Sequence, residues 1–445
     1  MLKPQTPEEV VMPDFDNTTD ILDLAIIGAG ISGVIHLHCA RQAGLSAVVL
    51  ERQTGIGGLW RHLPSWQDIQ ISPYDWALGD LPMHGGAQPQ VLANIESWVD
   101  RFDLATGIRT SSPVTRAFHV GNHWELVTPR GTVRARHLVA ATGGHNLPIV
   151  PDVPRRGGGL LERHSGALHD PNELVGRTVL VVGGGASAFD LLDLCLAQNA
   201  RRILWVYRGV HWFTPTGKPK QIAGSVRPFA RMQASGVSAA RQNAAIGADL
   251  SARYVKFGIQ AIEPSRPIDV LHDQLMPGRA RMLAEFNQLE RHPGSVLAID
   301  GRQVTLTDGT THDVDVLLWG TGYAIDLSYF AQPALAAIQN VNELGRRCGC
   351  IFRSFDAPDL YFPGVGLDGI GSSTWANLLM ARSIMSHIRG TAKLDMVAVG
   401  HKVNHFEIAR YLGERDPGTY GAGRDWAFYR HLALTTPDDQ PYPIV

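Results

Sequence analysis

A glycine cluster between a short apolar run and a helix-compatible stretch constrains the fold of this chain more than any other feature. The apolar run 24–27 predicts a buried parallel strand that ends at the glycines. Residues 31–42 predict a helix that stops at Gly44, and 47–50 predict a second strand closed by Glu51. Together these elements form a β-α-β unit, which is typical of an α/β fold with a parallel sheet.

The glycines have the spacing of a dinucleotide-binding turn, G-x-G-x-x-G. In order, they allow a tight turn, close approach of the backbone to a pyrophosphate, and contact between helix and strand. The helix N-terminus then faces the phosphates, and a carboxylate at the end of the second strand can accept hydrogen bonds from ribose hydroxyls. The residues of this predicted site are Gly28, Gly30, Ser32, Gly33, Glu51 and Arg52.

The same order of elements recurs in the middle of the chain. The run 179–182 predicts a strand, about 186–198 a helix, and 203–207 the next strand. The chain therefore contains two nucleotide-binding folds of one kind. Its predicted class is α/β, with two Rossmann-like dinucleotide-binding domains in three ββα layers.

The second glycine turn differs from the first in charge. Alanine takes the third glycine position, and a cation rather than a carboxylate stands at the end of the following strand. A cation there suits the 2′-phosphate of NADPH, which a carboxylate would repel. Lys218 and Lys220 could assist. The predicted NADPH contacts are Gly183, Gly185, Ser187, Ala188 and Arg208.

Two hairpin signals organise the rest of the chain in a repeated way. Pro129-Arg130-Gly131 precedes a strand that ends at Thr142-Gly143, and Asp308-Gly309 precedes one that ends at Thr321-Gly322. We expect the strand before each Thr-Gly pair to join the sheet of the first unit. The second unit would then be an insertion that makes the first domain discontinuous.

The predicted domain limits follow from this arrangement. They are an N-terminal segment at 1–20, a first domain at 21–165 and 306–390, an inserted NADPH-binding domain at 166–305, and a C-terminal extension at 391–445. Within the insertion, 211–293 has helical patches without clean periodicity, and we interpret it as a lid or wall of a substrate cavity.

A glycine pair after the first unit has a different use. Gly57-Gly58 allow a flat ring system to approach the backbone, and Trp60 adds an apolar wall. We therefore predict ring contacts at Gly58, Leu59 and Trp60. A simple turn beside a core tryptophan is the alternative.

Composition and charge exclude several classes of function. A formal net charge of −2 gives no basic field for nucleic acid or an anionic membrane surface. No apolar run reaches the roughly 20 residues needed to cross a bilayer, and no signal peptide is visible. We therefore expect a cytoplasmic protein without nucleic-acid or membrane partners, and its motifs call for no metal ion.

As an ordered set, the motifs resemble those of the class B flavoprotein monooxygenases, the group of flavin-containing and Baeyer–Villiger monooxygenases. The matching segments are Gly28-x-Gly30-x-x-Gly33, Gly57-Gly58-Leu59-Trp60, Ala141-Thr142-Gly143, Gly183-x-Gly185-x-Ser187-Ala188-x-Asp190 and Thr321-Gly322-Tyr323. The resemblance spans roughly 23–390. It implies that the first site binds FAD and the second binds NADPH.

The resemblance further implies an FAD-dependent, NADPH-consuming monooxygenase. In this family NADPH reduces FAD, oxygen forms a C4a-(hydro)peroxyflavin, and retained NADP⁺ shields it until a small organic substrate takes one oxygen atom at N, S or C. Baeyer–Villiger oxygenation of a ketone stays open as an alternative. The implied partners are the substrate and molecular oxygen, and a homodimer is expected.

Individual roles are also implied by the resemblance. Val114 would place the FAD adenine through its backbone, and 364–374 would meet the flavin ring. Thr142, Gly143, Thr321, Gly322 and Tyr323 are further cofactor contacts. The candidates for catalytic residues are His169, Tyr74, Asp75 and Trp76.

The chain departs from the family in its linker. The fingerprint F-x-G-x-x-x-H-x-x-x-W/Y is represented only by 164–170, where His164 takes the aromatic start and the spacing from glycine to His169 is one residue short. The subclass therefore stays open. A structural role for His169 is the alternative to a place beside the nicotinamide.

Three other functions compete with this interpretation. A pyridine nucleotide-disulfide reductase needs a redox cysteine pair beside the flavin, but neither C-x-x-C nor C-x-x-x-x-C occurs, and Cys348-Gly349-Cys350 lies after the second Thr-Gly pair. An NAD(P)H oxidase or quinone reductase without substrate oxygenation also fits the motifs. A protein that holds FAD without turnover would have no use for the second site.

Overall fold

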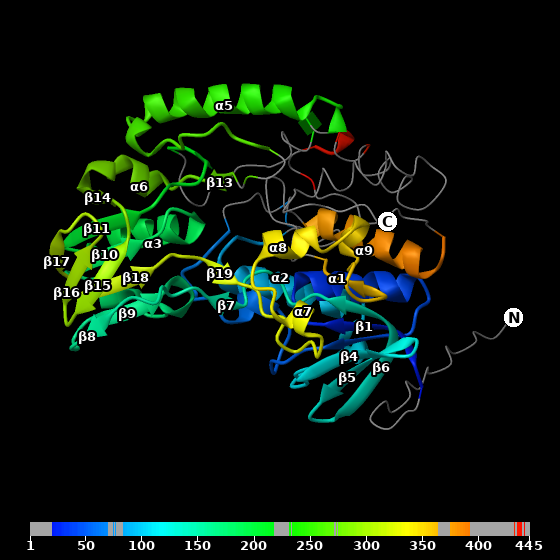
Figure 1. Cartoon of the computed structure of the whole chain (residues 1–445). Coiled ribbons are helices and arrows are strands. Elements are labelled where there is room, and N and C mark those ends of the chain that lie inside the picture. The colour runs from blue at the N-terminus through cyan, green and yellow to red at the C-terminus, as the bar shows by residue number, and fades with distance from the viewer. Residues whose placement is uncertain are drawn as a thin grey trace, which may run out of the picture.

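The structure, a computed structural model, shows two sheet-centred units side by side (Figure 1). It describes residues 20–69, 74, 76, 83–217, 231–232, 234–270, 273, 275–363, 374–391, 431, 434–437 and 440. Within these ranges, no helix is long and apolar enough to span a bilayer.

The first unit is built on a seven-stranded sheet in the order β3-β2-β1-β6-β5-β4, with β20 also paired to β6. The strands are β1 (Leu22–Ile27), β2 (Ala47–Leu50), β3 (Ile108–Arg109), β4 (Arg116–Val120), β5 (His123–Thr128), β6 (Gly131–Ala140) and β20 (Leu360–Tyr361). β1 runs parallel to both β2 and β6, whereas β4, β5 and β6 form an antiparallel meander. The first β-α-β unit and the first hairpin are thereby confirmed.

Among the described residues, three long helices cover this sheet and its loops. They are α1 (Ile31–Gln42), α2 (Gln88–Arg101) and α9 (Thr374–Ile388). α1 packs beside α9 on one side of the sheet (Figure 1). Most of α1 is buried, including Val34, Ile35 and Leu37, because it lies between the sheet and α9. This contact joins the two ends of the first domain.

The second unit is a five-stranded parallel sheet in the order β14-β11-β10-β18-β9. Its strands are β9 (Leu161–His164), β10 (Thr178–Val182), β11 (Arg202–Tyr207), β14 (Leu289–Pro293) and β18 (Val316–Trp319). The helix α3 (Ala186–Ala197) follows β10, which confirms the second β-α-β unit.

Both faces of the second sheet are buried, which explains its continuous apolar strands. Val179 and Val181 face a core made with the helices α3, α5 (Ala239–Lys256) and α6 (Ala280–Ala284). Leu180 and Val182 face the opposite core. That core is covered by a four-stranded sheet of β8 (Arg155–Arg156), β15 (Val296–Asp300), β16 (Gln303–Leu306) and β17 (Thr311–Asp313).

The strand before the second Thr-Gly pair corrects the expectation from the sequence. β18 pairs with β10 and β9 of the second sheet, not with the first sheet. Each central strand, β1 and β10, thus has its own Thr-Gly strand as a neighbour, β6 and β18. The strands at 311–319 therefore belong to the inserted unit and not to the returning segment 306–390, and β9, expected within 21–165, also lies in the second sheet.

The second unit is nevertheless an insertion, as predicted. The chain leaves the first unit through β7 (Leu147–Pro148) and returns through β19 (Tyr323–Ala324), and these two strands pair with each other between the units (Figure 1). After the return, β20 rejoins the first sheet. The remaining domain limits stay predictions.

The described part of 211–293, interpreted from the sequence as a lid or wall of a substrate cavity, packs on the second unit. The helices α5 and α6 pack on the core of the second unit, and β14 is the edge strand of its sheet. β12 (Phe213–Thr214) and β13 (Met276–Pro277) form a separate pair. This part of the chain is an outer layer of the second unit.

Shorter elements complete the described chain. They are α7 (Pro333–Ala336), α8 (Val341–Arg346), and short 3₁₀ helices at Gly58–Arg61, Ala105–Gly107, Ser165–Ala167, Pro171–Leu174, Gln260–Ile262, Phe286–Gln288 and Cys350–Phe352.

Candidate functional site

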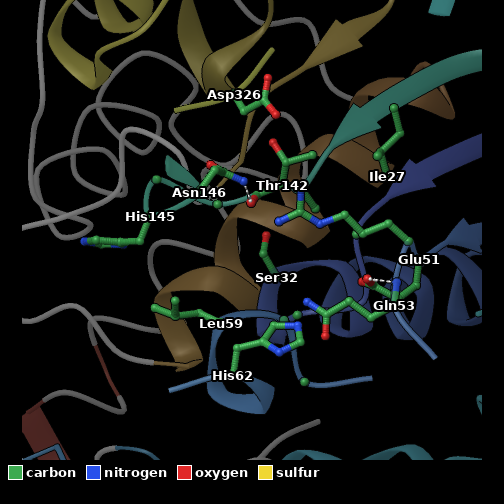
Figure 2. Close-up of a pocket in the computed structure, with 18 of the residues that line it drawn as sticks. Ile27, Ser32, Glu51, Gln53, Leu59, His62, Thr142, His145, Asn146 and Asp326 are labelled. Carbon is green, nitrogen blue, oxygen red and sulfur yellow. Dashed lines mark hydrogen bonds between the residues drawn. The ribbon is translucent and has the colours of Figure 1, made fainter. Parts of the chain in front are cut away.

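A cavity of about 790 Å³ opens between the first glycine turn, the loop at 57–63 and the strands β7 and β19, which form the crossovers between the two units. Residues that the sequence predicted as contacts line it: Gly28, Gly30, Ser32, Glu51, Arg52, Gly58, Leu59, Trp60, Trp76, Val114, Thr142, Gly143 and Tyr323. Figure 2 shows Ser32, Thr142 and Asn146 around the same space, with Glu51 and Gln53 to one side. The first predicted site is thus one continuous cavity.

The first and last glycines of the turn are required by packing. A Cβ on Gly33 would lie 1.8 Å from the carbonyl oxygen of Gly28, because α1 lies directly on the turn. Gly28 has a φ of +100°, and a Cβ there would lie 2.8 Å from the carbonyl oxygen of Ala141. These glycines hold the helix, the turn and the first Thr-Gly strand together.

The middle glycine has a different environment. Gly30 has an extended backbone, and a Cβ there would meet the Cα of Gly58 at 3.6 Å, an ordinary contact. The loop is held against the turn by the Gly57 N–H, which donates to the Ala29 carbonyl over 2.9 Å. The space beside Gly30 therefore belongs to the cavity rather than to the protein core.

Glu51 ties the end of β2 to the glycine turn. Its side chain is buried, and one carboxylate oxygen accepts from the Ala29 N–H at 2.6 Å, while the other accepts from the Gln53 N–H at 2.8 Å. A carboxylate has further lone pairs, so Glu51 can still accept from a ligand hydroxyl. Its place on the cavity wall agrees with the predicted ribose contact.

Several buried polar atoms of the cavity residues have no hydrogen-bond partner within the described structure. They are Ser32 Oγ, Gln53 Oε1, Trp76 Nε1 and Asn146 Oδ1. In the side chain of Asn146, the amide nitrogen Nδ2 donates to the Thr142 carbonyl at 2.8 Å, while the amide oxygen is left without a partner among the described residues. Because buried polar groups are normally paired, these atoms indicate that the cavity is built for a polar ligand. These donors and acceptors, with a helix N-terminus beside them, fit a dinucleotide such as FAD.

Trp60 and Trp76 form one wall of the cavity. Their rings meet edge to face with centroids 6.1 Å apart, and both side chains line the space. Tyr74 is half-buried but does not line the cavity, and Asp75 lies outside the described residues. Of the expected segment 364–374, Thr374 lines the cavity and is the only member described.

The second glycine turn repeats the packing of the first. A Cβ on Gly183 would lie 2.2 Å from the Gly320 carbonyl oxygen, and one on Gly320 would lie 2.7 Å from the Cα of Ala188. Gly185 precedes α3 as its N-cap, and Ser187 lies in its first turn. These residues and Arg208, which is exposed at the end of β11, lie outside the described cavity lining.

The crossover residues lie between the two turns. Tyr323 lines the cavity. Its ring packs edge to face with the rings of His145 and His164, with ring centroids 5.4 and 4.8 Å apart. Burial lowers the pKa of His164, and its hydrogen bond to Gly322 opposes part of that shift. The candidate His169 is exposed and does not line the cavity, whereas Gly166 and Ala167 do.

Sequence reasoning missed part of the lining. The additional residues include Gln53, His62, Leu63, Pro113, Thr115, His145, Asn146, Pro148, Gly166, Ala167, Asp326, Ser328, Tyr329 and Asn377. Most follow a predicted element within a few residues, as Asn146 follows the first Thr-Gly pair. That position was the available signal, but loop residues have no periodicity that tells which side chain faces a ligand.

Two glycine turns of the same construction, joined by paired crossovers beside one cavity, define a protein with two dinucleotide-binding units. The family model described as pyridine nucleotide-disulphide oxidoreductase matches residues 25–250, about half of the chain. The chain belongs to this family. The spacings of a redox cysteine pair, C-x-x-C and C-x-x-x-x-C, do not occur in its sequence, and the described cysteines Cys39, Cys195 and Cys348 are buried and form no disulfide.

The chain is similar to known flavin monooxygenases. Dimethylaniline monooxygenase [N-oxide-forming] 2 of Cavia porcellus is 24% identical, over 72% of this chain and 65% of that protein. A Baeyer-Villiger monooxygenase of Streptomyces coelicolor is 29% identical, over 49% of this chain and 44% of that protein. The chain thus spans less than two thirds of the length of either relative. These likenesses confirm the resemblance to class B flavoprotein monooxygenases.

A solved structure extends the comparison to the fold. OTEMO in complex with FAD and NADP superposes with a TM-score of 0.61 at 16% identity, covering 84% of this chain and 86% of that one. At such identity the likeness concerns the fold alone. It confirms the predicted α/β class of the fold.

Proposed function

We propose that this protein is an FAD-dependent, NADPH-consuming monooxygenase that transfers one oxygen atom from O₂ to a small organic substrate. One observation carries the proposal: the first glycine turn and the paired-glycine loop border a cavity in which several buried polar atoms have no hydrogen-bond partner among the described residues. The relatives, which are monooxygenases by name, support the reaction class.

FAD would occupy the cavity along the first glycine turn. Glu51 would accept hydrogen bonds from the ribose, the α1 N-terminus with Ser32 would face the pyrophosphate, and Val114 would lie beside the adenine. Gly58, Leu59 and Trp60 would border the flavin ring. FAD bound there supplies the electron-transfer and oxygen chemistry, while the protein positions the reactants and excludes water.

NADPH would bind to the second unit. Gly183, Gly185 and the first turn of α3 would hold its pyrophosphate, and Arg208 would hold the 2′-phosphate. Tyr323 lies on the crossover between this turn and the cavity, beside Thr321 and Gly322. Trp76 is the candidate for the substrate side of the cavity, and Tyr74, Asp75 and His169 stay proposals.

The reaction class is tested with the FAD-loaded protein. Mixing with NADPH without oxygen should bleach the flavin, and a protein that only stores FAD would keep its colour. Admitting ¹⁸O₂ with a panel of amines, sulfides, an indole and ketones should then give a product heavier by one ¹⁸O. Hydrogen peroxide in place of every labelled product would instead identify an oxidase, and a lactone or ester from a ketone would identify Baeyer–Villiger oxygenation.

The preference for NADPH should depend on Arg208. Because a hydrogen bond to a charged group contributes about 1.5–3 kcal/mol, the R208Q variant should raise the KM for NADPH by roughly ten- to a hundredfold. The KM for NADH should change little. R130Q, which changes an exposed arginine of the first hairpin, is the control. Equal effects of R208Q on both nicotinamides would contradict the assignment.

A cytoplasmic location and a homodimer also stay proposals. Cell fractionation tests the first, and size-exclusion chromatography with light scattering tests the second. A monomer across the micromolar range would exclude the dimer.

A further inference from the structure

The carbonyl of Gly322 lies where the two crossovers meet, next to the paired strands β7 and β19. It accepts the Ile149 N–H at 3.0 Å and the His164 Nε2 hydrogen, also at 3.0 Å. Ile149 follows β7 on the outgoing crossover, where the chain leaves the first unit. Gly322 precedes β19 on the returning crossover, and His164 is the last residue of β9. Both lone pairs of this carbonyl oxygen are thus used, and they join Ile149 and His164 to a segment more than 150 positions later in the sequence.

His164 can make its contacts in only one tautomer. A carbonyl only accepts, so Nε2 must carry the hydrogen that bonds to Gly322. Nδ1 is then unprotonated and accepts from the Gly166 N–H at 3.3 Å. The ring also packs edge to face on Tyr323, and the side chain is buried. His164 therefore connects the returning crossover to Gly166, a residue of the cavity wall.

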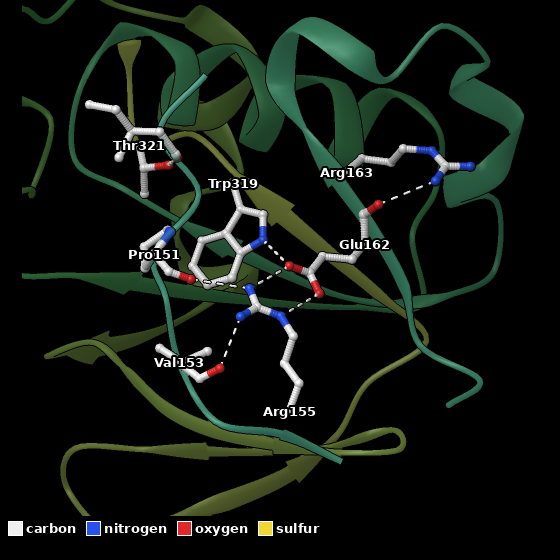
Figure 3. A network of polar contacts seen from close by, with 8 residues as sticks. Pro151, Val153, Arg155, Glu162, Arg163, Trp319 and Thr321 are labelled. Atoms are coloured by element: carbon white, nitrogen blue, oxygen red, sulfur yellow. Dashed lines mark hydrogen bonds and ion pairs between the residues drawn. The ribbon is translucent and has the colours of Figure 1, made fainter. Parts of the chain in front are cut away.

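Glu162, two residues before His164 on β9, makes a second set of contacts that holds the same crossover (Figure 3). One carboxylate oxygen of Glu162 accepts the indole N–H of the buried Trp319 at 2.8 Å. Arg155 donates to both Glu162 oxygens, at 2.9 and 3.4 Å, and to the carbonyls of Pro151 and Val153. Trp319 ends β18, so this network holds the start of the returning crossover against the outgoing one.

We propose that Glu162 and His164, which project from the same face of β9, are positioning residues that together hold the returning crossover 319–324. This proposal rests on the proposed function, because the crossover carries Tyr323 to the cavity wall and joins the second nucleotide site to the first. Neither side chain is itself placed on the cavity wall. They set the geometry at which the nicotinamide reaches the flavin, and hydride transfer depends strongly on that geometry.

The main test compares two replacements of His164 in the FAD-loaded protein. H164F keeps an aromatic ring, the residue of the family fingerprint, but loses both hydrogen bonds, whereas H164Q keeps a donor for the Gly322 carbonyl. The limiting rate of anaerobic flavin reduction by NADPH should fall about tenfold in H164F, with the Kd for NADPH within about twofold of the original, and H164Q should recover most of the rate. Removing the Glu162 contacts with E162A should lower the same limiting rate.

Amide hydrogen exchange provides a readout that does not depend on turnover. The Ile149 amide should exchange about tenfold faster in H164F than in the original protein or H164Q, because a weakened contact opens more often. This measurement is made on the FAD-loaded protein without NADPH. It reports on the crossover contacts even if the flavin is never reduced.

Two matched controls separate positioning from general destabilisation. H312F makes the same change in another edge-to-face pair of the second unit, His292–His312, which has the same 4.8 Å centroid distance. E290A removes another arginine-bound carboxylate. Glu290 binds Arg202 and lies on β14, the edge strand opposite β9 in the same sheet. Both controls should leave the reduction rate unchanged.

Each result decides a different question. If the original protein's flavin is not bleached by NADPH, the proposed function fails, and hydrogen exchange alone decides whether the crossover contacts hold. If the original protein is bleached and H164F is reduced equally fast, the positioning role is overturned. An equal loss of rate in H312F, or a loss of bound FAD that accounts for the effect of H164F, also overturns it.

Discussion

Replacing Gly33 with alanine should prevent the first unit from folding and leave no FAD-loaded protein. The new Cβ would lie 1.8 Å from the backbone oxygen of Gly28, in a turn that is itself packed against β6. Neither atom belongs to a flexible side chain, so the clash is relieved only by separating α1 from the sheet. Overpacking of this kind costs about 3 kcal/mol or more, a large part of the stability of a typical domain. Soluble yield, circular dichroism and flavin content measure the result.

Two other glycine-to-alanine variants serve as comparisons. G30A should fold, because its Cβ meets only the Cα of Gly58 at 3.6 Å, but it should lower FAD affinity at least about a hundredfold by placing a methyl group where the pyrophosphate approaches. G44A should cost only about 1–2 kcal/mol, because its φ is +70° but no atom lies within 4 Å. FAD-loaded G33A, or G30A with unchanged FAD affinity, would contradict the assignment of this turn.

The second large effect is expected from a buried histidine on the same helix. His36 is fully buried one turn after Ser32, and its Nδ1 hydrogen donates to the Ser32 carbonyl at 2.7 Å. Its Nε2 has no partner within the described structure. Burial lowers the pKa of His36 from 6.5 to about 4, with the hydrogen bond to Ser32 opposing part of the shift. The native site therefore holds a neutral imidazole that resists protonation.

The pH dependence follows from this difference. Below about pH 6.5 the unfolded chain binds a proton at His36 that the folded chain does not bind until about pH 4, so stability is lost as the pH falls between these values. The loss approaches about 3 kcal/mol, at 1.36 kcal/mol per pKa unit. In H36L, the free energy of unfolding should fall less between pH 7.5 and 4.5, as measured by urea titration with excess FAD.

An exposed histidine provides the control for this titration. His84 lies on the surface, so H84L should keep the acid sensitivity of the original protein. An H36L variant that loses stability with falling pH as steeply as H84L would show that His36 is not the group responsible.

Comparison of the two glycine turns shows where sequence reasoning succeeded and where it failed. The strands, helices and turns of both β-α-β units were predictable, because apolar runs, glycine spacing and helix stops are local signals. The sheet that β18 joins was not predictable. The Val-Leu-rich run of β18 fits beside the central strand of either sheet. Its pairing with β10 and β9 and the packing of Gly320 on Ala188 place it in the second unit.

The candidate site divides in a similar way. Glu51, Trp60 and Thr142 were predictable because they stand at fixed positions in motifs, and all three line the cavity. His169 was chosen from a linker pattern with altered spacing, and it lies on the surface instead. His164, five residues earlier, is the buried member of that linker, because β9 ends there beside Gly322.

The sequence by itself determined that this chain would build two dinucleotide-binding turns, since each needs only glycines at set spacings between a strand and a helix. The tertiary structure alone decided how the turns are joined: β7 pairs with β19, and β9 brings Glu162 and His164 against the returning crossover. The physical reason is range. A turn forms from neighbours in the chain, whereas these contacts connect residues about 160 positions apart and arise only when both units have folded.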